Sequence, residues 1–152
     1  FQAAQDHKGT SFVAIYQNCV IFNDGVHDAY TNKQTRDDTS VLLTHGEPMI
    51  FGKEKNMAIA LDGFKVKTGV IGKDIKESEI LKHDKHNQTL AFLLSSLKQP
   101  EAPIPMGVIY QTEQAPATYD EQVHKQIQMV SQKKGKKSMK DLLHSGETWT
   151  VK

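Results

Sequence analysis

The chain has 152 residues, which is room for one domain with a tail. Its 19 Lys and Arg side chains nearly balance its 18 Asp and Glu side chains, leaving a formal charge of +1. Because nucleic-acid and membrane-surface proteins usually carry a clear basic excess, we expect no nucleic acid and no membrane as partner. No apolar run approaches the roughly 20 residues of a membrane-spanning helix, and no export signal opens the sequence, so we expect a cytoplasmic location.

The first third of the chain is predicted to follow the helix–glycine–strand order that is typical of an α/β sheet. Good helix formers at residues 1–7 are followed by Lys8 and Gly9, which are typical of a helix end. Residues 11–16 are nearly continuous in apolar character, which predicts a strand buried on both faces. Cys19 would then lie just past the carboxyl end of a parallel strand, the edge at which open α/β sheets bind ligands. Residues 26–39 are polar and predict an irregular excursion with one helical turn.

The middle third is predicted to be rich in β-structure. Residues 40–44 form a strand candidate, and residues 49–61 are predicted to form a hairpin with a polar tip at 53–56. Residues 64–71, after the Asp62-Gly63 turn, can add short strands.

The last third is predicted to hold helices around one more strand. An apolar helix of about three turns is expected over 90–97, and a buried strand over 106–110. A Thr-x-x-Glu capping box starting at Thr118 predicts a helix running to about Lys133. Residues 138–144 predict a short helix.

Cys19 is the main candidate for a functional side chain. A single cysteine excludes an internal disulfide, and no second thiol in the chain can complete a Cys-rich metal site. The residue is either a small buried hydrophobe or a thiolate acting as nucleophile or soft metal ligand. A nucleophile needs a base, for which His27 is nearby in sequence, whereas a ligand needs further donors from elsewhere.

Other polar motifs are expected to be structural. His83 and His86 are spaced so that one helical turn could let them share a metal, but a solvated polar segment is the expectation there. Residues 23–25 are expected to be a turn. The lysine cluster at 133–137 could touch phosphates or an anionic partner, and a solvated loop is expected. Trp149 is expected to anchor the chain end on a body, either of this chain or of another subunit.

Short motifs along nearly the whole chain occur in a fixed order. They are His7-Lys8-Gly9-Thr10-Ser11-Phe12-Val13, Gln17-Asn18-Cys19-Val20-Ile21-Phe22-Asn23, Arg36-Asp37-Asp38, Gly46-Glu47-Pro48-Met49-Ile50-Phe51-Gly52, Leu61-Asp62-Gly63-Phe64, His83-Asp84, Thr89-Leu90-Ala91-Phe92 and Leu142-Leu143-His144-Ser145-Gly146-Glu147-Thr148-Trp149. Together they resemble the C-terminal half of the β subunit of the thiamine-diphosphate-dependent 2-oxoacid:ferredoxin oxidoreductases. The resemblance implies that the chain is part of a longer subunit.

This resemblance implies an α/β fold, namely the C-terminal part of a thiamine-diphosphate-binding parallel-sheet fold with a β-rich appendage and C-terminal helices. Residues 1–19 would end the cofactor-binding domain, 20–90 would form the C-terminal domain of the β subunit, and 91–152 a helical and strand extension. The implied activity is oxidative decarboxylation of a 2-oxoacid, pyruvate or 2-oxoglutarate, to an acyl-coenzyme A. Electrons would pass through a 4Fe-4S cluster to ferredoxin, and the partner would be an α subunit. By resemblance Cys19 is the fourth cluster thiolate, the other three coming from the N-terminal half.

The chain departs from the family at the cofactor motif. The Gly-Asp-Gly signature, with its Asn that helps hold Mg²⁺ on thiamine diphosphate, does not occur here, and neither 23–25 nor 62–63 fits it. We therefore expect that the chain alone binds neither thiamine diphosphate nor an intact cluster and has no turnover, and no catalytic residue is assigned. His7 and Lys8 carry no transferable role. The alternative function is a non-catalytic protein-interaction module.

Overall fold

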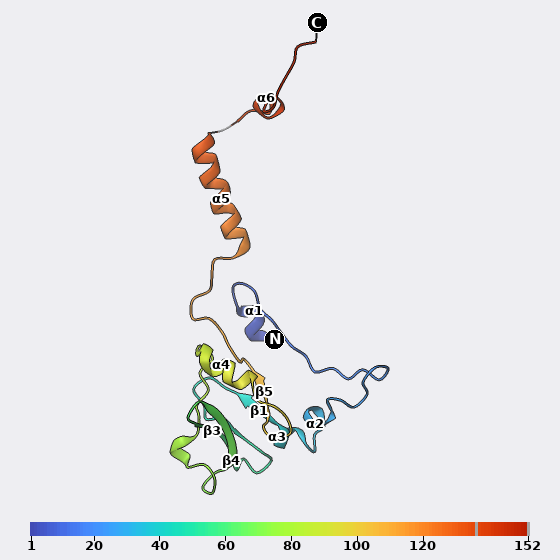
Figure 1. Cartoon of the computed structure of the whole chain (residues 1–152), viewed down its shortest axis with the longest axis vertical. Helices are drawn as coiled ribbons and strands as arrows, with labels where there is room; N and C mark the ends of the chain where they lie inside the picture. Colours follow the sequence, from blue (N-terminus) through green and yellow to red (C-terminus); the bar gives the residue numbers. More distant parts are fainter. Residues whose placement is uncertain (136, 152) are drawn as a thin grey trace. The chain divides into compact units, whose positions relative to one another are not determined.

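The computed structural model describes residues 1–135 and 137–151, without the side chain of Lys134. It divides into two units by internal contacts (Figure 1). The central unit comprises residues 13–114, and the terminal unit comprises residues 1–12 and 115–152. Because this division reflects internal contacts and not function, the functional division at residues 19 and 90 stays a prediction.

The central unit contains two small β-sheets. Strand β1 (Ser40–Leu43) pairs in parallel with β5 (Ile104–Gly107). The second sheet is antiparallel in the order β2 (Ile50–Phe51), β3 (Met57–Asp62), β4 (Lys65–Val70). The strand at 40–44 and the hairpin at 49–61 are confirmed, and residues 64–71 provide one strand, not two. Mixed helices and strands with a parallel pair are compatible with the α/β class.

The second strand of the parallel pair differs from the buried strand expected over 106–110, because β5 begins at Ile104, residues 108–110 form no strand and none of its residues is fully buried. Pro105 lies opposite Val41 in the register, although the expected strand began at residue 106. Proline is tolerated because β5 pairs on one side only, so its other edge needs no backbone N–H. A Cβ atom at Gly107 would lie 2.9 Å from the carbonyl oxygen of Leu43, so the close approach of the two strands requires glycine.

Strand β3 is buried on both faces over residues 58–60, and this part organises the core. Ile59 faces the main cluster, and Ala58 and Ala60 face a smaller cluster with Ile75. The buried members of the main cluster come from β1, β2, β3, helix α4 and the residue before β2: Val41, Leu43, Met49, Phe51, Ile59, Leu90 and Leu94.

Helix α4 (Gln88–Ser95) covers this core with one face (Figure 1). Its first turn is capped by Asn87, whose side chain accepts a hydrogen bond from the Leu90 backbone N–H at 2.9 Å. Leu90 and Leu94 are four residues apart and therefore lie on the same face of the helix, where both are buried. The helix is shorter than the predicted three turns.

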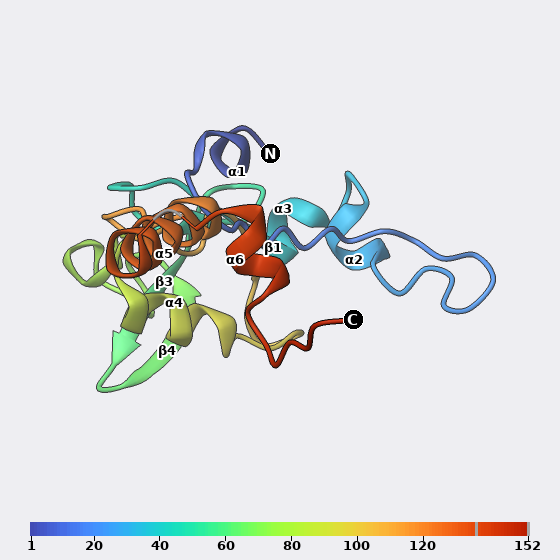
Figure 2. The same ribbon diagram turned by 90° about the horizontal axis from the view of Figure 1, so that it is seen from above.

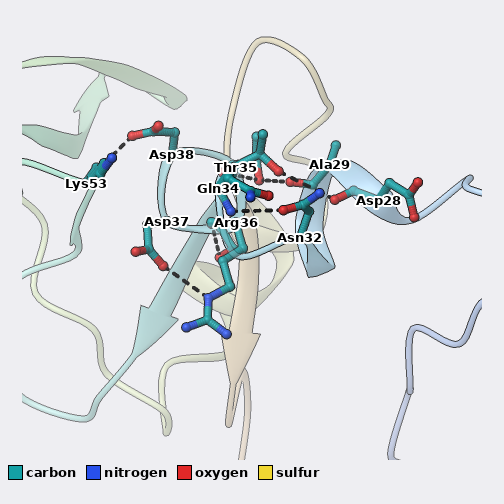
Figure 3. A network of polar contacts seen from close by, with 11 residues as sticks. Asp28, Ala29, Asn32, Gln34, Thr35, Arg36, Asp37, Asp38 and Lys53 are labelled. Carbon is teal, nitrogen blue, oxygen red and sulfur yellow. Dashed lines mark hydrogen bonds and ion pairs between the residues drawn. The ribbon is translucent and has the colours of Figure 1, made fainter.

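Residues 26–39 form two short helices, α2 (Asp28–Thr31) and α3 (Arg36–Thr39), where one turn was expected. Figure 3 shows the polar contacts that tie them together and to the hairpin. Asp38 Oδ1 accepts from the Lys53 backbone N–H at 2.8 Å, and the Asp37 carbonyl accepts from the Gly52 N–H at 2.8 Å. The Arg36-Asp37-Asp38 motif therefore holds the tip of the β2–β3 hairpin. A single 3-10 turn, η1 (Glu77–Glu79), follows β4.

The predicted buried strand at 11–16 is wrong. These residues form neither a helix nor a strand, and Phe12 and Ile15 are 93% and 66% exposed. Figure 2 shows the stretch before α2 as an extended loop. The apolar run has no neighbouring strand to pair with in the part of the chain that the structure describes. Cys19 consequently does not follow a strand end.

The terminal unit is made of three helices, α1 (Gln2–Asp6), α5 (Tyr119–Lys134) and α6 (Met139–Leu143). The capping box at the start of α5 is confirmed, because the Thr118 backbone N–H donates to Glu121 Oε2 at 3.0 Å. The other Glu121 oxygen pairs with Lys8 Nζ at 2.6 Å. None of the unit's described residues is buried.

The basic break at 133–137 can be followed only in part. Helix α5 ends at Lys134 and is followed by Gly135, which has a φ of 67°. Lys136 lies outside the described residues, so the lysine cluster is not described as a whole. Across the chain apart from residues 136 and 152, no helix is long and apolar enough to cross a lipid bilayer.

Candidate functional site

Cys19 is presented on a short closed loop. The Asn23 backbone N–H donates to the Cys19 carbonyl at 2.9 Å, and the two residues form an isolated antiparallel bridge. The Asn18 side chain closes the neck, since its Nδ2 donates to Asp24 Oδ1 at 2.8 Å and its Oδ1 accepts from the Gly25 N–H at 2.9 Å. The turn expected at 23–25 is thus confirmed.

An aromatic cluster supports the base of this loop. The ring of His27 packs edge-on against Tyr16 with centroids 5.0 Å apart, and Tyr30 lies 5.9 Å from Tyr16. The His27 Nδ1 atom is buried without a hydrogen-bond partner. The sequence suggested His27 only as a possible base. Its packing was not predicted, because the two tyrosines that enclose it lie 11 residues before it and three after it, and no local pattern joins them.

The exposed thiol suits a ligand better than a nucleophile. Cys19 is free and exposed, so the expectation of a small buried hydrophobe is wrong. No hydrogen bond joins the Cys19 thiol to an imidazole among the described residues, so a paired base for nucleophilic attack is not assembled. The same part of the chain contains no group of three or more His, Cys, Asp or Glu side chains that could hold a metal ion. Any metal bound at Cys19 would need further donors from another polypeptide segment.

The segment 83–86 is a second polar cluster, built differently from the expectation. His83 is only 1% exposed, and its Nε2 lies 2.8 Å from the carbonyl oxygen of Val108. Because a carbonyl can only accept, Nε2 carries the proton and donates. The Nδ1 of His83 is buried with no hydrogen-bond partner. The expectation of a solvated segment is therefore wrong at His83.

His86 and His45 complete this cluster. His86 Nδ1 donates to the Gln111 carbonyl at 2.7 Å, and the Gln111 N–H donates to the Lys85 carbonyl at 2.7 Å. His45 packs edge-on against His86 with centroids 5.4 Å apart, and its Nδ1 accepts from the Lys85 N–H at 3.3 Å. The cluster joins the segment before α4 to the segment after β5. Its hydrogen bonds indicate a structural role, not a shared metal.

Two backbone hydrogen bonds hold residues 46–47 beside His83 and help to bury its side chain. Its backbone N–H donates to the Glu47 carbonyl at 2.9 Å, and its carbonyl accepts from the Gly46 N–H at 2.8 Å. Gly46 has a φ of 83°, which permits the turn that brings residues 46–47 beside residue 83. Two of the sequence motifs, Gly46–Gly52 and His83-Asp84, thus meet as partners in the fold.

Trp149 does not pack against the terminal unit to which it belongs. Its side chain is 85% exposed. Anchoring of the chain end on the central unit or on another subunit stays a prediction.

Comparison with known proteins identifies the class that the motifs indicated: the chain is similar to part of a subunit of a 2-oxoacid oxidoreductase. The relative is 2-oxoglutarate oxidoreductase subunit KorB of Mycobacterium tuberculosis (strain ATCC 25618 / H37Rv), which is 31% identical over 154 residues. The similarity covers 99% of this chain and 40% of that protein, consistent with a C-terminal half. The resemblance found in the sequence is thereby confirmed over nearly the whole chain.

The chain spans two fifths of the length of the curated relative that it matches. No family model and no solved structure matches the chain.

Proposed function

We propose that the chain is the C-terminal part of the β subunit of a 2-oxoacid:ferredoxin oxidoreductase that works in the cytoplasm with an α subunit. The complete enzyme would decarboxylate a 2-oxoacid on thiamine diphosphate and Mg²⁺, transfer the acyl group to coenzyme A and pass two electrons through a 4Fe-4S cluster to ferredoxin. In this proposal Cys19 supplies one cluster thiolate. Residues 1–19 end the cofactor-binding domain, 20–90 form the next domain, and 91–152 extend it.

The observation that carries the proposal is the exposed thiol of Cys19 on a loop closed by Asn18. A 4Fe-4S cluster takes four cysteine thiolates, and a donor in one chain segment can serve only if other segments can approach it. The accessible sulfur meets that requirement. The similarity to KorB supports the oxidoreductase class.

The surroundings of the thiol support burial of this loop against more protein. Val20, Ile21 and Phe22 are 74%, 81% and 88% exposed directly beside Cys19. A contiguous apolar stretch in water is unusual in a soluble domain and is typical of a surface that another protein segment covers. When covered, these side chains would exclude water from the cluster and thereby influence its reduction potential.

The iron content of the full-length protein tests the role of Cys19. Replacing the thiol by Cys19→Ser in the complete protein should remove most of the cluster iron and the visible absorption of the cluster. Val20→Ser is the matched control, because it changes the neighbouring side chain and keeps the thiol. Unchanged iron in Cys19→Ser would contradict the ligand role.

Calorimetric titration tests the role of the chain by itself. We expect no binding when thiamine diphosphate and Mg²⁺ are added to the 152-residue chain, since the family's cofactor signature is missing from it. Micromolar binding would refute this part of the proposal.

A non-catalytic interaction module is the second candidate function. It is favoured by the exposed apolar side chains of the terminal unit, among them Ile127, Leu142 and Leu143. Anaerobic purification of the full-length complex, assayed with pyruvate and 2-oxoglutarate, separates the two. Substrate-dependent ferredoxin reduction supports the enzyme, and its absence in a complex that retains all its subunits and cofactors supports the module.

A further inference from the structure

The chain contains two Asp-Gly pairs, Asp24-Gly25 and Asp62-Gly63, and both glycines lie in turns. In such a pair the backbone nitrogen of the glycine can attack the side-chain carboxyl carbon of the aspartate, because glycine has no Cβ atom that hinders the approach. The attack closes a succinimide ring and releases water. Addition of water reopens the ring, either to aspartate or to isoaspartate, in which the main chain runs through the former side chain.

Both reacting groups of the first pair are held by Asn18. Asn18 Nδ2 donates to Asp24 Oδ1 at 2.8 Å, and the Gly25 backbone N–H donates to Asn18 Oδ1 at 2.9 Å. Gly25 is also half-buried and crowded, since a Cβ atom there would lie 3.2 Å from Asp28 Oδ2. Ring closure at Asp24 therefore requires that both hydrogen bonds to Asn18 break first.

The second pair lies in the open turn between β3 and β4. Asp62 is the last residue of β3, and Gly63 and Phe64 form the two-residue connection to β4. In the described part of the chain, no hydrogen bond or ion pair holds the Asp62 carboxylate, and the Gly63 N–H has no backbone acceptor. Apart from the chain neighbours of Gly63, no heavy atom lies within 4 Å of the position that a Cβ atom there would take. The attacking nitrogen and the carboxyl carbon are therefore both accessible.

Only the end of the β3–β4 ladder opposes the backbone rotation that ring closure at Asp62 needs. Asp62 faces Lys65 in the last pair of the register, and both residues are exposed. The buried part of β3 ends at residue 60, so this pair lies outside the core. Terminal pairs of this kind open at a low free-energy cost compared with the core of a domain. The fold therefore restrains Asp62 less than it restrains Asp24.

We propose that Asp62-Gly63 is a site of spontaneous isomerisation to isoaspartate, and that Asn18 protects Asp24-Gly25 from the same reaction. No enzyme or cofactor is needed: water leaves when the ring closes and is added when it opens, so the mass of the chain is unchanged. The charge is kept, because the former backbone carboxyl becomes the free carboxylate. The product has one more methylene group in its main chain, which disrupts the pairing with Lys65. This proposal is independent of the proposed enzymatic activity.

Incubation of the 152-residue chain in heavy-oxygen water tests the proposal. At neutral pH and physiological temperature, isoaspartate should accumulate at residue 62 over weeks, and each ring opening should add one heavy oxygen there. Residue 24 should react at least about tenfold more slowly, the factor implied by two hydrogen bonds that must break first. Chromatography and mass spectrometry of proteolytic peptides compare the two sites within the same molecule. Equal rates at the two sites, or an unmodified residue 62, would overturn the proposal.

Three variants test the cause of the difference. Asp62→Glu should abolish the accumulation at residue 62, because the longer side chain would have to close a larger and less favourable ring. Asn18→Ala should raise the rate at residue 24 towards the rate at residue 62. Asn32→Ala is the matched control, because it removes an asparagine side chain that accepts from the Gln34 N–H at 3.0 Å, and it should leave both rates unchanged. An unchanged rate at residue 24 in Asn18→Ala, or an equal rise in Asn32→Ala, would overturn the protective role of Asn18.

The same incubation in concentrated urea separates the fold from the local sequence. Once the chain is unfolded, Asn18 no longer holds Asp24, and the turn no longer presents Asp62. The two sites should then react at similar rates, and the rate at residue 24 should rise above its value in the folded chain. A difference between the sites that persists undiminished in urea would overturn the proposal, because the neighbouring residues and not the fold would then set the rates.

Discussion

The two units of the chain differ in where their helices find support. In the central unit, α4 has two leucines buried against three strands, whereas no described side chain of α5 or α6 in the terminal unit is buried. The terminal helices are instead defined by the local capping boxes at Thr118 and Ser138 and by one exposed long-range ion pair between Lys8 and Glu121. Capping selects where a helix starts, but packing supplies most of the energy that keeps it folded. The central unit should therefore be the stable part of the chain.

Truncating one leucine in each unit is the strongest way to break this comparison. Leu94→Ala empties a fully buried position and should lower the free energy of unfolding of the central unit by about 3 kcal/mol. Leu142→Ala makes the same chemical change at a side chain that is 65% exposed, and it should cost no more than about 0.5 kcal/mol. Residue-resolved hydrogen exchange during urea titration measures both. Equal costs would mean that the units do not differ as described.

Removing the buried imidazole should have the next largest effect. His83→Ala leaves a cavity and deprives the Val108 carbonyl of its donor, which should destabilise the central unit by about 2–3 kcal/mol. His144→Ala changes an exposed histidine after α6 and should be nearly neutral. Urea unfolding followed by circular dichroism compares them. A neutral His83→Ala would show that residues 83–86 are not held as described.

The positions of Leu94 and His83 also show what the sequence could predict. The apolar spacing of Leu90 and Leu94 is a local pattern, and it located α4 correctly. The burial of His83 depends on residues 46–47 and on Val108, which are distant in the chain, so no local pattern around residue 83 signals it. The same limit applies to β1 and β5: both were expected as strands, but their parallel pairing across about 60 residues was not.

The wrong strand at 11–16 has a related cause. An apolar run reports a preference for burial, and it does not report whether a neighbouring strand is present to accept its backbone hydrogen bonds. Cys19 was found as a candidate because it is the only thiol and was expected just past a strand end; that strand does not form, but the thiol is exposed on a loop. The capping box was predicted correctly at α5 because all of its partners lie within four residues.

The contact between α3 and the hairpin gives a smaller effect that sharpens the description of the central unit. Asp38→Ala removes the acceptor of the Lys53 backbone N–H and should cost about 1 kcal/mol. Asp37→Ala removes only an exposed ion pair with Arg36, at 3.4 Å, and should cost about 0–0.5 kcal/mol. Chemical unfolding curves rank the two. A neutral Asp38→Ala would show that the side chain of Asp38 does not hold the hairpin tip.

The smallest predicted effect concerns the acid sensitivity of α6 in the terminal unit. Asp141 Oδ2 accepts hydrogen bonds from the Ser138 backbone N–H and hydroxyl, both at 2.8 Å, and these bonds lower the pKa of Asp141 below its ordinary value of 3.8. Because the pKa is lower in the folded helix, the stabilisation is complete above the unfolded value and is lost as the pH falls through the folded one. Helical chemical shifts of residues 139–143 should therefore stay constant from neutral pH to about pH 5 and decline below about pH 4. Asp141→Asn should give a lower helix content at neutral pH and no decline on acidification. Glu147→Gln leaves the capping box intact and should show the same decline as the unchanged chain. A decline of equal size in Asp141→Asn would mean that another group governs the acid response, and that the capping box does not define the start of α6.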